Sequence, residues 1–209
     1  ILVKNMSETP RLIYDLSLES LREIVTAWKE PSFRAKQIWQ GLYQQLWSAP
    51  EQFSNLPSAL RSKLAQEFSF SHLTPSHVAR SSDRETVKTL FTLPDNKAIE
   101  AVLMRYESRR TLCISTQAGC AMGCVFCATG QMGFKRHLSS GEIVEQVLYY
   151  ARMLKQEGKA VTNIVVMGMG EPFHNYDNTL AAIDRLNHSD GFNLGARRFT
   201  ISTVGLVPM

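Results

Sequence analysis

The second half of the sequence alternates between short apolar segments and longer amphipathic segments, and this alternation constrains the fold more than any other feature. Residues 111–116, 161–171 and 197–203 have the pattern of strands, whereas residues 139–158 and 176–188 have apolar positions at helical spacing. Strands that alternate with helices of this length form βαβ units around a parallel sheet, either doubly wound or closed into a barrel. A complete barrel needs more repeats than this chain holds. We therefore expect an α/β fold with an incomplete sheet.

The beginning of the chain has a different pattern, which predicts a small helical domain. Residues 17–30 have helical spacing after Ser17, a suitable N-cap residue, and Pro31 is expected to end this helix. Residues 32–47 and 57–68 supply a second and a third helix. The stripe expected to be buried on the second helix consists of Phe33, Ile38, Leu42, Tyr43 and Leu46.

A β-hairpin is expected between the two parts. Residues 86–106 alternate between apolar and polar side chains and are interrupted by a turn at Pro94, Asp95 and Asn96. We divide the chain into a helical accessory domain of residues 1–75, a linker and hairpin of residues 76–110, and an incomplete α/β domain of residues 111–209.

Composition excludes several classes of protein. The chain of 209 residues has no apolar run long enough to cross a membrane, and its beginning lacks the apolar segment of a signal peptide. We expect a cytoplasmic protein, in which thiols stay reduced and structural disulfides are rare. The net charge of +4 permits nucleic-acid binding without requiring it. Because the sequence stops soon after an apolar segment, we expect a fragment of a longer protein.

Basic residues bracket the region that holds the cysteines. Between positions 105 and 136 the only acidic residue is Glu107, and the basic residues are Arg105, Arg109, Arg110, Lys135 and Arg136. Two interpretations stay open: an electrostatic footprint for a polyanion, or two solvated surface clusters.

All four cysteines lie between positions 113 and 127. Cys120, Cys124 and Cys127 have the spacing C-x3-C-x2-C in the loop after the first predicted strand, and Cys113 lies within that strand. A zinc site, a disulfide and an iron–sulfur cluster compete as explanations. A structural zinc site has four closed ligands, whereas a [4Fe–4S] cluster held by three cysteines leaves one iron free for a cofactor or substrate. Ligands of α/β proteins bind at the carboxyl ends of the strands, so the pattern favours a catalytic cluster, with zinc as the alternative.

The ends of the next two predicted strands carry further candidate residues. Gly168, Gly170 and Glu171 follow the second strand, where glycines let a ligand approach the backbone closely. A tight strand-to-helix turn would need the same residues. Ser202 and Thr203 lie at the same edge on the third strand, and their hydroxyls could bond to a ligand.

These motifs resemble a known group of proteins. The spacing C-x3-C-x2-C after the first strand of a βα barrel, with Phe126 before the last cysteine, resembles the radical S-adenosylmethionine (SAM) superfamily. The segments CISTQAGCAMGCVFCATGQMGFKRHLSSGEIVEQV, MGMGEPFHNYDN and RRFTISTVGLVP resemble the RlmN/Cfr family of RNA adenine methyltransferases. The GFKR segment and the helical domain are closer to the RlmN branch. His137 and Phe173 depart from the family, which usually has Asn and Leu there.

The resemblance implies a fold and a set of cofactor-binding residues. Residues 111–209 would form the first half of a radical SAM barrel. Cys120, Cys124 and Cys127 would hold a [4Fe–4S] cluster whose open iron binds SAM. Gly170, Glu171 and Ser202 would bind SAM, the first two at its amino group.

The resemblance also implies a reaction. The product would be 2-methyladenosine in 23S rRNA and in tRNA, formed through a methylated cysteine and a 5′-deoxyadenosyl radical. That cysteine lies outside this chain, because no cysteine follows Cys127. Cys113 would close a disulfide with it to release the product, and Glu100 would be the general base that removes the adenine proton.

Several further expectations concern partners and alternatives. Flavodoxin or ferredoxin is expected as the electron donor, with no membrane partner and a monomeric state. The target base must be unpaired, since its reacting carbon is inaccessible within a stacked helix. Two other functions stay open: a radical SAM enzyme with a different substrate, and a zinc-containing RNA-binding protein.

Overall fold

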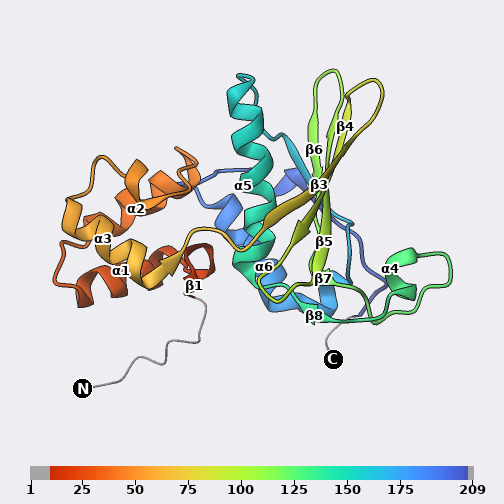
Figure 1. Cartoon of the computed structure of the whole chain (residues 1–209), viewed down its shortest axis with the longest axis horizontal. Coiled ribbons are helices and arrows are strands. Elements are labelled where there is room, and N and C mark those ends of the chain that lie inside the picture. The colour runs from red at the N-terminus through yellow and green to blue at the C-terminus, as the bar shows by residue number, and fades with distance from the viewer. Residues whose placement is uncertain (1–9, 207–209) are drawn as a thin grey trace.

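The first part of the chain is helical, as predicted. The structure, a computed structural model, describes residues 10–206, so the outer ends of the first and last predicted domains lie outside the described residues. The three predicted helices are confirmed (Figure 1) as α1 (Leu18–Ala27), α2 (Phe33–Tyr43) and α3 (Ser58–Glu67). The hydroxyl of Ser17 caps α1 by accepting a hydrogen bond from the Ser20 N–H at 3.1 Å. The helix ends before Pro31, with Lys29 in a left-handed conformation at φ 62°.

Two details of the helical part differ from the prediction. Phe33, expected in the buried stripe of α2, is 55% exposed because it is the first residue of the helix and lies at the edge of the core. Two short strands, β1 (Arg11–Leu12) and β2 (Phe68–Ser69), form a parallel pair that was not predicted. Strands of two residues are too short to produce an alternating pattern.

A six-stranded mixed sheet with the order β10-β9-β6-β5-β4-β3 forms the centre of the second part. The parallel arrangement expected for the three later strands is confirmed in β6, β9 and β10. The predicted hairpin is confirmed as β4 and β5, with Asn96 at φ 62° in its turn. The strands are β3 (Thr74–Arg80), β4 (Thr86–Thr92), β5 (Ala98–Arg105), β6 (Arg110–Cys113), β9 (Asn163–Val166) and β10 (Phe199–Ile201).

Strand β3 occupies most of the segment that the sequence predicted to be the beginning of a linker. It pairs antiparallel with β4 at the edge of the sheet. Almost all its side chains are exposed, so no alternation between apolar and polar residues marks it as a strand. The expected α/β class with an incomplete sheet is otherwise confirmed.

One face of the sheet is buried against α5 (Ser140–Gln156), beside which α6 (Tyr176–Asn187) packs. Leu112 and Ile164 are fully buried on this face. The hydroxyl of Tyr150 on α5 donates to the Ala101 carbonyl oxygen at 2.8 Å and lies 2.9 Å from the Thr89 hydroxyl. Burial raises the pKa of Tyr150 to about 12.

The other face of the sheet is open. Figure 1 shows α5 between the helical part and the sheet, and no described helix lies across the far side. Side chains that alternate with the buried ones, among them Glu100, Cys113 and Val165, are therefore only partly buried. No helix between residues 10 and 206 is both long and apolar enough to cross a membrane.

Polar contacts join the helical part to α5 and α6. The Asp15 carboxylate accepts hydrogen bonds from the Gly141 N–H at 2.7 Å and the Ser140 hydroxyl at 3.2 Å. These groups lie at the N-terminus of α5, where a negative charge is favourable. Arg185 of α6 donates to the carbonyl oxygens of Asp15 and Leu16. The position of the first part is thus set by α5, the helix that also packs on the sheet.

Candidate functional site

The residues predicted to bind the cluster and SAM lie in the segments at the carboxyl ends of β6, β9 and β10. The chain that leaves β6 forms a long loop, which starts and ends in the short antiparallel strands β7 (Gln117–Ala118) and β8 (Arg136–His137). This loop carries the short helix α4 (Ala128–Gln131) away from the sheet (Figure 1). The cysteines of the C-x3-C-x2-C motif all lie on this loop, as the sequence predicted.

Glycine is required at the root of this loop. Gly119 has φ 75°, and a Cβ atom there would lie 1.9 Å from the carbonyl oxygen of Gly133 on the returning segment. Only glycine adopts this conformation without strain and leaves room for the oxygen. Gly123 also has a positive φ, 62°, but a Cβ atom there would have no neighbour within 4 Å. The two ends of the loop therefore cross closely at Gly119 and not at Gly123.

The three loop cysteines are free thiols, and no disulfide joins any two of the four cysteines. Cys120 is buried, whereas Cys124 and Cys127 are partly buried and joined by a backbone hydrogen bond of 3.1 Å from the Cys127 N–H. Within residues 10–206, no three His, Cys, Asp or Glu side chains come close enough to hold a metal ion. Binding of a metal by these three cysteines would therefore require their thiols to lie closer together. At the tip of the loop, Val125 and Phe126 are 88% and 89% exposed, and the Val125 carbonyl oxygen accepts a hydrogen bond from the Gln131 side chain at 3.0 Å.

Cys113 and Glu100 lie apart from these thiols, on the open face of the sheet. Cys113 pairs with Val102 across the β5–β6 ladder, and Glu100 is two residues from Val102 on the same face. Such diagonal neighbours are about 7–8 Å apart. Burial raises the pKa of the Cys113 thiol, although a hydrogen bond from the Met167 backbone opposes this. Lys88 forms a 3.0 Å ion pair with the Glu100 carboxylate.

The loop after β9 contains Gly168, Gly170 and Glu171. Gly170 has φ 104°, and a Cβ atom there would lie 2.6 Å from the Cβ of Gln117; one on Gly168 would lie 2.7 Å from the Ile114 carbonyl oxygen. These glycines therefore let the loop pack closely against the segment after β6. The sequence left two roles open for these glycines, a tight turn and close approach of a ligand, and the structure shows the tight packing.

The Glu171 carboxylate is buried and bonded within the protein. It accepts hydrogen bonds from the Phe173 N–H at 3.0 Å, the Thr203 hydroxyl at 2.5 Å and the Val204 N–H at 3.0 Å. It thus joins the loop after β9 to the end of β10. Ser202, beside Thr203, is exposed at the same edge. A carboxylate has about four acceptor positions, so one remains for a further donor.

Sequence reasoning missed the polar residues that support these loops. Gln117 contacts Glu171, His137 and His174 through its side-chain amide. Arg136 forms a two-pronged ion pair with the buried carboxylate of Glu142. No motif joins these positions, because they meet only after the chain has folded.

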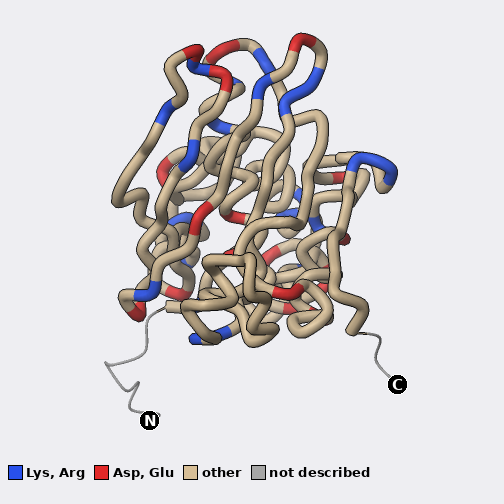
Figure 2. The backbone as a smooth tube through the Cα atoms, turned by 90° about the vertical axis from the view of Figure 1, so that its right-hand side faces the viewer, with Lys and Arg blue, Asp and Glu red and all other residues tan. Residues whose placement is uncertain are grey.

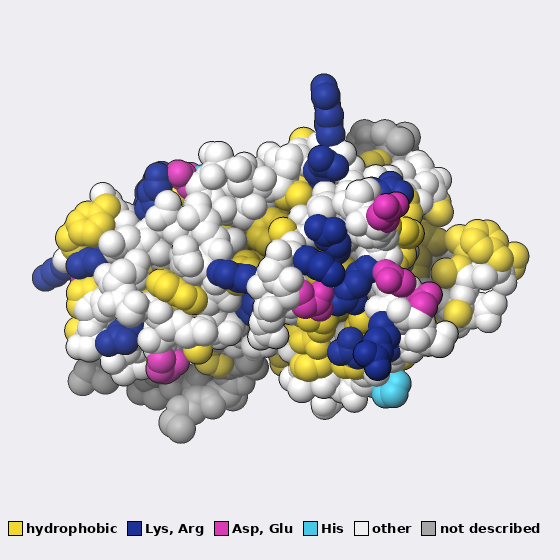
Figure 3. Space-filling view, turned by 90° about the horizontal axis from the view of Figure 1, so that it is seen from above, with side chains coloured by type: hydrophobic (Ala, Val, Ile, Leu, Met, Phe, Trp, Pro, Cys, Tyr) yellow, Lys and Arg dark blue, Asp and Glu magenta, His cyan; other side chains and the backbone are white. Residues whose placement is uncertain are grey.

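The basic residues that bracket the cysteines in sequence are separated in space. Arg105, Arg109 and Arg110 lie around the turn before β6, whereas Lys135 and Arg136 lie in the loop beyond its far end. Figure 2 shows Lys and Arg together with acids along the upper turns, and Figure 3 shows this end from above. The two groups therefore do not form one continuous patch, and binding of a polyanion by either group stays a prediction.

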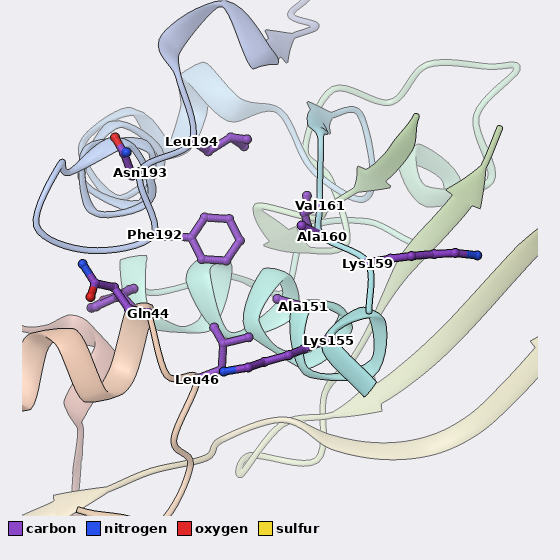
Figure 4. A pocket seen from close by; sticks show the side chains of 11 residues that line it. Gln44, Leu46, Ala151, Lys155, Lys159, Ala160, Val161, Phe192, Asn193 and Leu194 are labelled. Atoms are coloured by element: carbon purple, nitrogen blue, oxygen red, sulfur yellow. The ribbon is translucent and has the colours of Figure 1, made fainter. Parts of the chain in front are cut away.

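A cavity of about 300 Å³ lies between the helical part, the end of α5 and the segment after α6 (Figure 4). Phe192, Leu46 and Val161 supply apolar walls, and Lys155 lies along one side. None of the predicted site residues lines this cavity, so it is separate from the candidate site.

Comparison with known proteins supports the class of protein that this fold and site define. A family model described as the radical SAM superfamily matches residues 114–209, and one described as the ribosomal RNA large subunit methyltransferase N-terminal domain matches residues 12–69. A crystal structure of a radical SAM methyltransferase from Sphaerobacter thermophilus superposes with a TM-score of 0.92 at 47% identity, covering 95% of this chain and 58% of that one. The architecture is thus that of a radical SAM domain with a helical domain before it.

Curated relatives narrow the class further. A probable dual-specificity RNA methyltransferase RlmN of Chloroflexus aurantiacus is 52% identical over 94% of this chain and 54% of its own length. The dual-specificity RNA methyltransferase RlmN 1 of Myxococcus xanthus is 45% identical over 97% of this chain and 56% of its own length. The chain is therefore similar to RlmN proteins over nearly all of its own length. It spans about half the length of the curated relatives it matches.

Proposed function

We propose that the protein is a radical SAM methyltransferase that forms 2-methyladenosine in 23S rRNA and in tRNA. The observation that carries the proposal is the meeting of two loops at one end of the parallel strands. The loop with three free thiols follows β6, and the loop with Gly170 and Glu171 follows β9, the strand paired with β6. The names of the relatives support RNA as the substrate.

In this proposal Cys120, Cys124 and Cys127 hold a [4Fe–4S] cluster. The donor set fits the group, since three free thiols on one loop, without a fourth beside them, leave one iron open. When bound, the cluster and SAM would supply the one-electron chemistry that cleaves SAM into a radical.

The residues proposed to bind SAM lie beside this loop. Gly170 packs against the Gln117 side chain and is only partly buried, so its backbone could still meet a ligand. Glu171 retains one acceptor position for an amino group, and Ser202 offers an exposed hydroxyl. The buried carboxylate of Glu171 also holds the end of β10 in place through Thr203. A single residue would thus both bind the amino group and position the neighbouring strand.

Glu100 and Cys113 are proposed to act on the target adenine at the open face of the sheet. The Glu100 carboxylate would remove the adenine proton, and its ion pair with Lys88 would orient it on the open face of the sheet. The Cys113 sulfur would form a disulfide with the methyl-carrying cysteine, which is not among the four cysteines of this sequence. This S–S bond would form as the bond from that cysteine's sulfur to the transferred carbon breaks, and the carbon would take the electron pair and a proton. The raised pKa of Cys113 keeps this thiol protonated until its partner arrives.

The remaining partners follow from this chemistry. A flavodoxin or ferredoxin would supply the electron, and the RNA would present its adenine unpaired. We also propose that the enzyme is monomeric and cytoplasmic. Two rivals remain as outcomes of the tests: a radical SAM enzyme with another substrate, and a zinc-containing RNA-binding protein.

Electron paramagnetic resonance of the anaerobically reconstituted, dithionite-reduced protein tests the cofactors. We expect a [4Fe–4S]⁺ signal that changes when SAM is added. Cys124→Ser should abolish the signal, and the matched control Cys113→Ser should keep it. Zinc in place of iron, with no signal, would favour the RNA-binding alternative.

Methylation is tested separately. Since no cysteine follows Cys127, the assay uses a chimera in which the second half of the Chloroflexus aurantiacus relative continues this chain. Mass spectrometry of digested 23S rRNA and tRNA should detect 2-methyladenosine, and Glu100→Gln should abolish it without affecting the cluster signal. A chimera that cleaves SAM but modifies neither RNA would point to another substrate.

A further inference from the structure

The Gln117 side chain is fully buried between the two loops of the candidate site. Its Oε1 accepts a hydrogen bond from the Glu171 backbone N–H at 2.9 Å. A backbone N–H can only donate, so this contact fixes which end of the amide is oxygen. The NH₂ group must therefore point the other way.

The NH₂ group of Gln117 points to two histidines. Nε2 of Gln117 lies 3.1 Å from Nδ1 of His137 and 3.1 Å from Nδ1 of His174. Because the amide nitrogen is a donor with two hydrogens, each Nδ1 must be an acceptor. Both imidazoles are then neutral, with their protons on Nε2. Protonation of either ring would set an N–H against an N–H.

The two rings form a compact group with Phe134. The His137 and His174 centroids are 4.9 Å apart, and each lies within 5.4 Å of the Phe134 centroid. Burial and the neighbouring His174 both lower the pKa of His137. For His137, the neutral state required by its hydrogen bond is therefore also the state that its environment favours.

The charged groups on the segments around His137 and His174 are exposed or bond to other residues. On β8, Arg136 is paired with Asp95 and Glu142, and on the preceding loop Lys135 is exposed. The Glu171 carboxylate is bonded to the end of β10, and Asp177 at the start of α6 is exposed. Neither acid forms a bond with the two rings that would favour their protonated form.

Gln117 also determines how closely the two loops approach. It begins β7 and pairs with His137 of β8 at the root of the cysteine loop. Its backbone N–H donates to the Met169 carbonyl oxygen at 3.2 Å, and its Cβ lies where a side chain on Gly170 would be. Movement of the Gln117 amide would therefore shift the cysteine loop relative to the Gly170–Glu171 loop.

We propose that Gln117 is a positioning residue for SAM, and that it holds the two loops in register only while His137 and His174 are both neutral. SAM affinity then depends on pH through these two rings. This inference rests on the proposed function, since it takes the two loops to be the SAM site. The state of the histidines is independent of that function.

The first test measures the histidines directly in the protein without cluster. Long-range ¹H–¹⁵N NMR should show both rings neutral and protonated on Nε2 at pH 7.5, with the signals of His77, an exposed strand residue, recorded in the same spectra for comparison. Gln117→Glu, which places a carboxylate against both rings, should shift their titration to higher pH. Protonation of either ring on Nδ1 in the unaltered protein would overturn the proposal.

The second test measures SAM affinity by calorimetry on the reconstituted protein between pH 7.5 and 5.5. Affinity should fall about tenfold on acidification, the loss expected when one buried hydrogen bond is broken. The double variant H137N/H174N should flatten this profile, since an Asn side-chain oxygen accepts at every pH, whereas the control His77→Asn should not. An unchanged profile in H137N/H174N would refute the positioning role. Absence of SAM binding at every pH would instead refute the proposed function and leave the NMR result standing.

Discussion

The buried carboxylate of Glu142 gives a quantitative prediction for the root of the cysteine loop. Its side chain is 4% exposed and accepts two hydrogen bonds of 2.8 Å from the Arg136 guanidinium. It also accepts a hydrogen bond of 2.9 Å from the Ser139 N–H, which completes the capping box of α5. Burial opposes ionisation, but these partners outweigh it and lower the pKa of Glu142 to about 2.

The magnitude follows from linkage between ionisation and folding. A pKa of about 2 in place of the usual 4.5 corresponds to about 3 kcal/mol of stability at neutral pH. Because the pKa is lowered on folding, this contribution is complete above pH 4.5 and is lost as the pH falls towards 2. Between pH 6 and pH 3 the loss amounts to about 2 kcal/mol.

The substitution Glu142→Gln isolates the charge, since glutamine can still accept from the Ser139 N–H. Urea unfolding at pH 7 should show a loss of about 2–3 kcal/mol in the free energy of unfolding. The loss is smaller than the full value because Arg136 is 30% exposed and retains its ion pair with Asp95. At pH 3 the variant and the unaltered protein should differ far less.

The matched control is Glu157→Gln. Glu157 also lies 2.8 Å from an arginine, Arg105, but its side chain is 36% exposed, so the loss should stay below about 1 kcal/mol at either pH. Equal losses for Glu142→Gln at pH 7 and pH 3 would refute the assignment of this stability to the Glu142 charge.

Three further predictions concern the loop, the core and the contact between the two parts. Gly119→Ala should prevent cluster reconstitution, measured as iron bound per chain, because its Cβ would lie 1.9 Å from a carbonyl oxygen. The control Gly123→Ala should still bind iron, and its positive φ should lower the free energy of unfolding by about 1–2 kcal/mol. Tyr150→Phe should lower the free energy of unfolding by about 1–2 kcal/mol, measured in urea, since it leaves a buried carbonyl oxygen without its donor. Asp15→Ala should lower it by about 1–2 kcal/mol by removing the acceptor at the N-terminus of α5; a change below about 0.5 kcal/mol would mean that this contact does not hold the helical part.

Much of the fold could be predicted because local patterns encode it. Ser17 before α1 and Ser139 with Glu142 before α5 mark helix starts through hydrogen bonds that close within three residues. The alternation in β4 and β5 records one buried face. Strand β3 was not predicted, because its pairing at the edge of the sheet is made by backbone groups, which every residue has. Its exposed side chains do not alternate between apolar and polar.

The residue pattern alone predicted the cysteines of the candidate site and the edge of the sheet at which they lie. The spacing of Cys120, Cys124 and Cys127 placed three thiols on one loop, since neighbours in the chain cannot separate far. Their position after a parallel strand placed that loop at the carboxyl edge of the sheet.

The contacts that support the site could not be predicted from this pattern. The clamp of Gln117 by two histidines, the bonding of Glu171 to the end of β10, and the separation of Arg105 from Arg136 depend on segments that are distant in sequence. Such contacts are set by the packing of β6 against β9 and by the course of the loops beyond them. A one-dimensional pattern records which faces are buried, but it does not record which distant donor meets which acceptor.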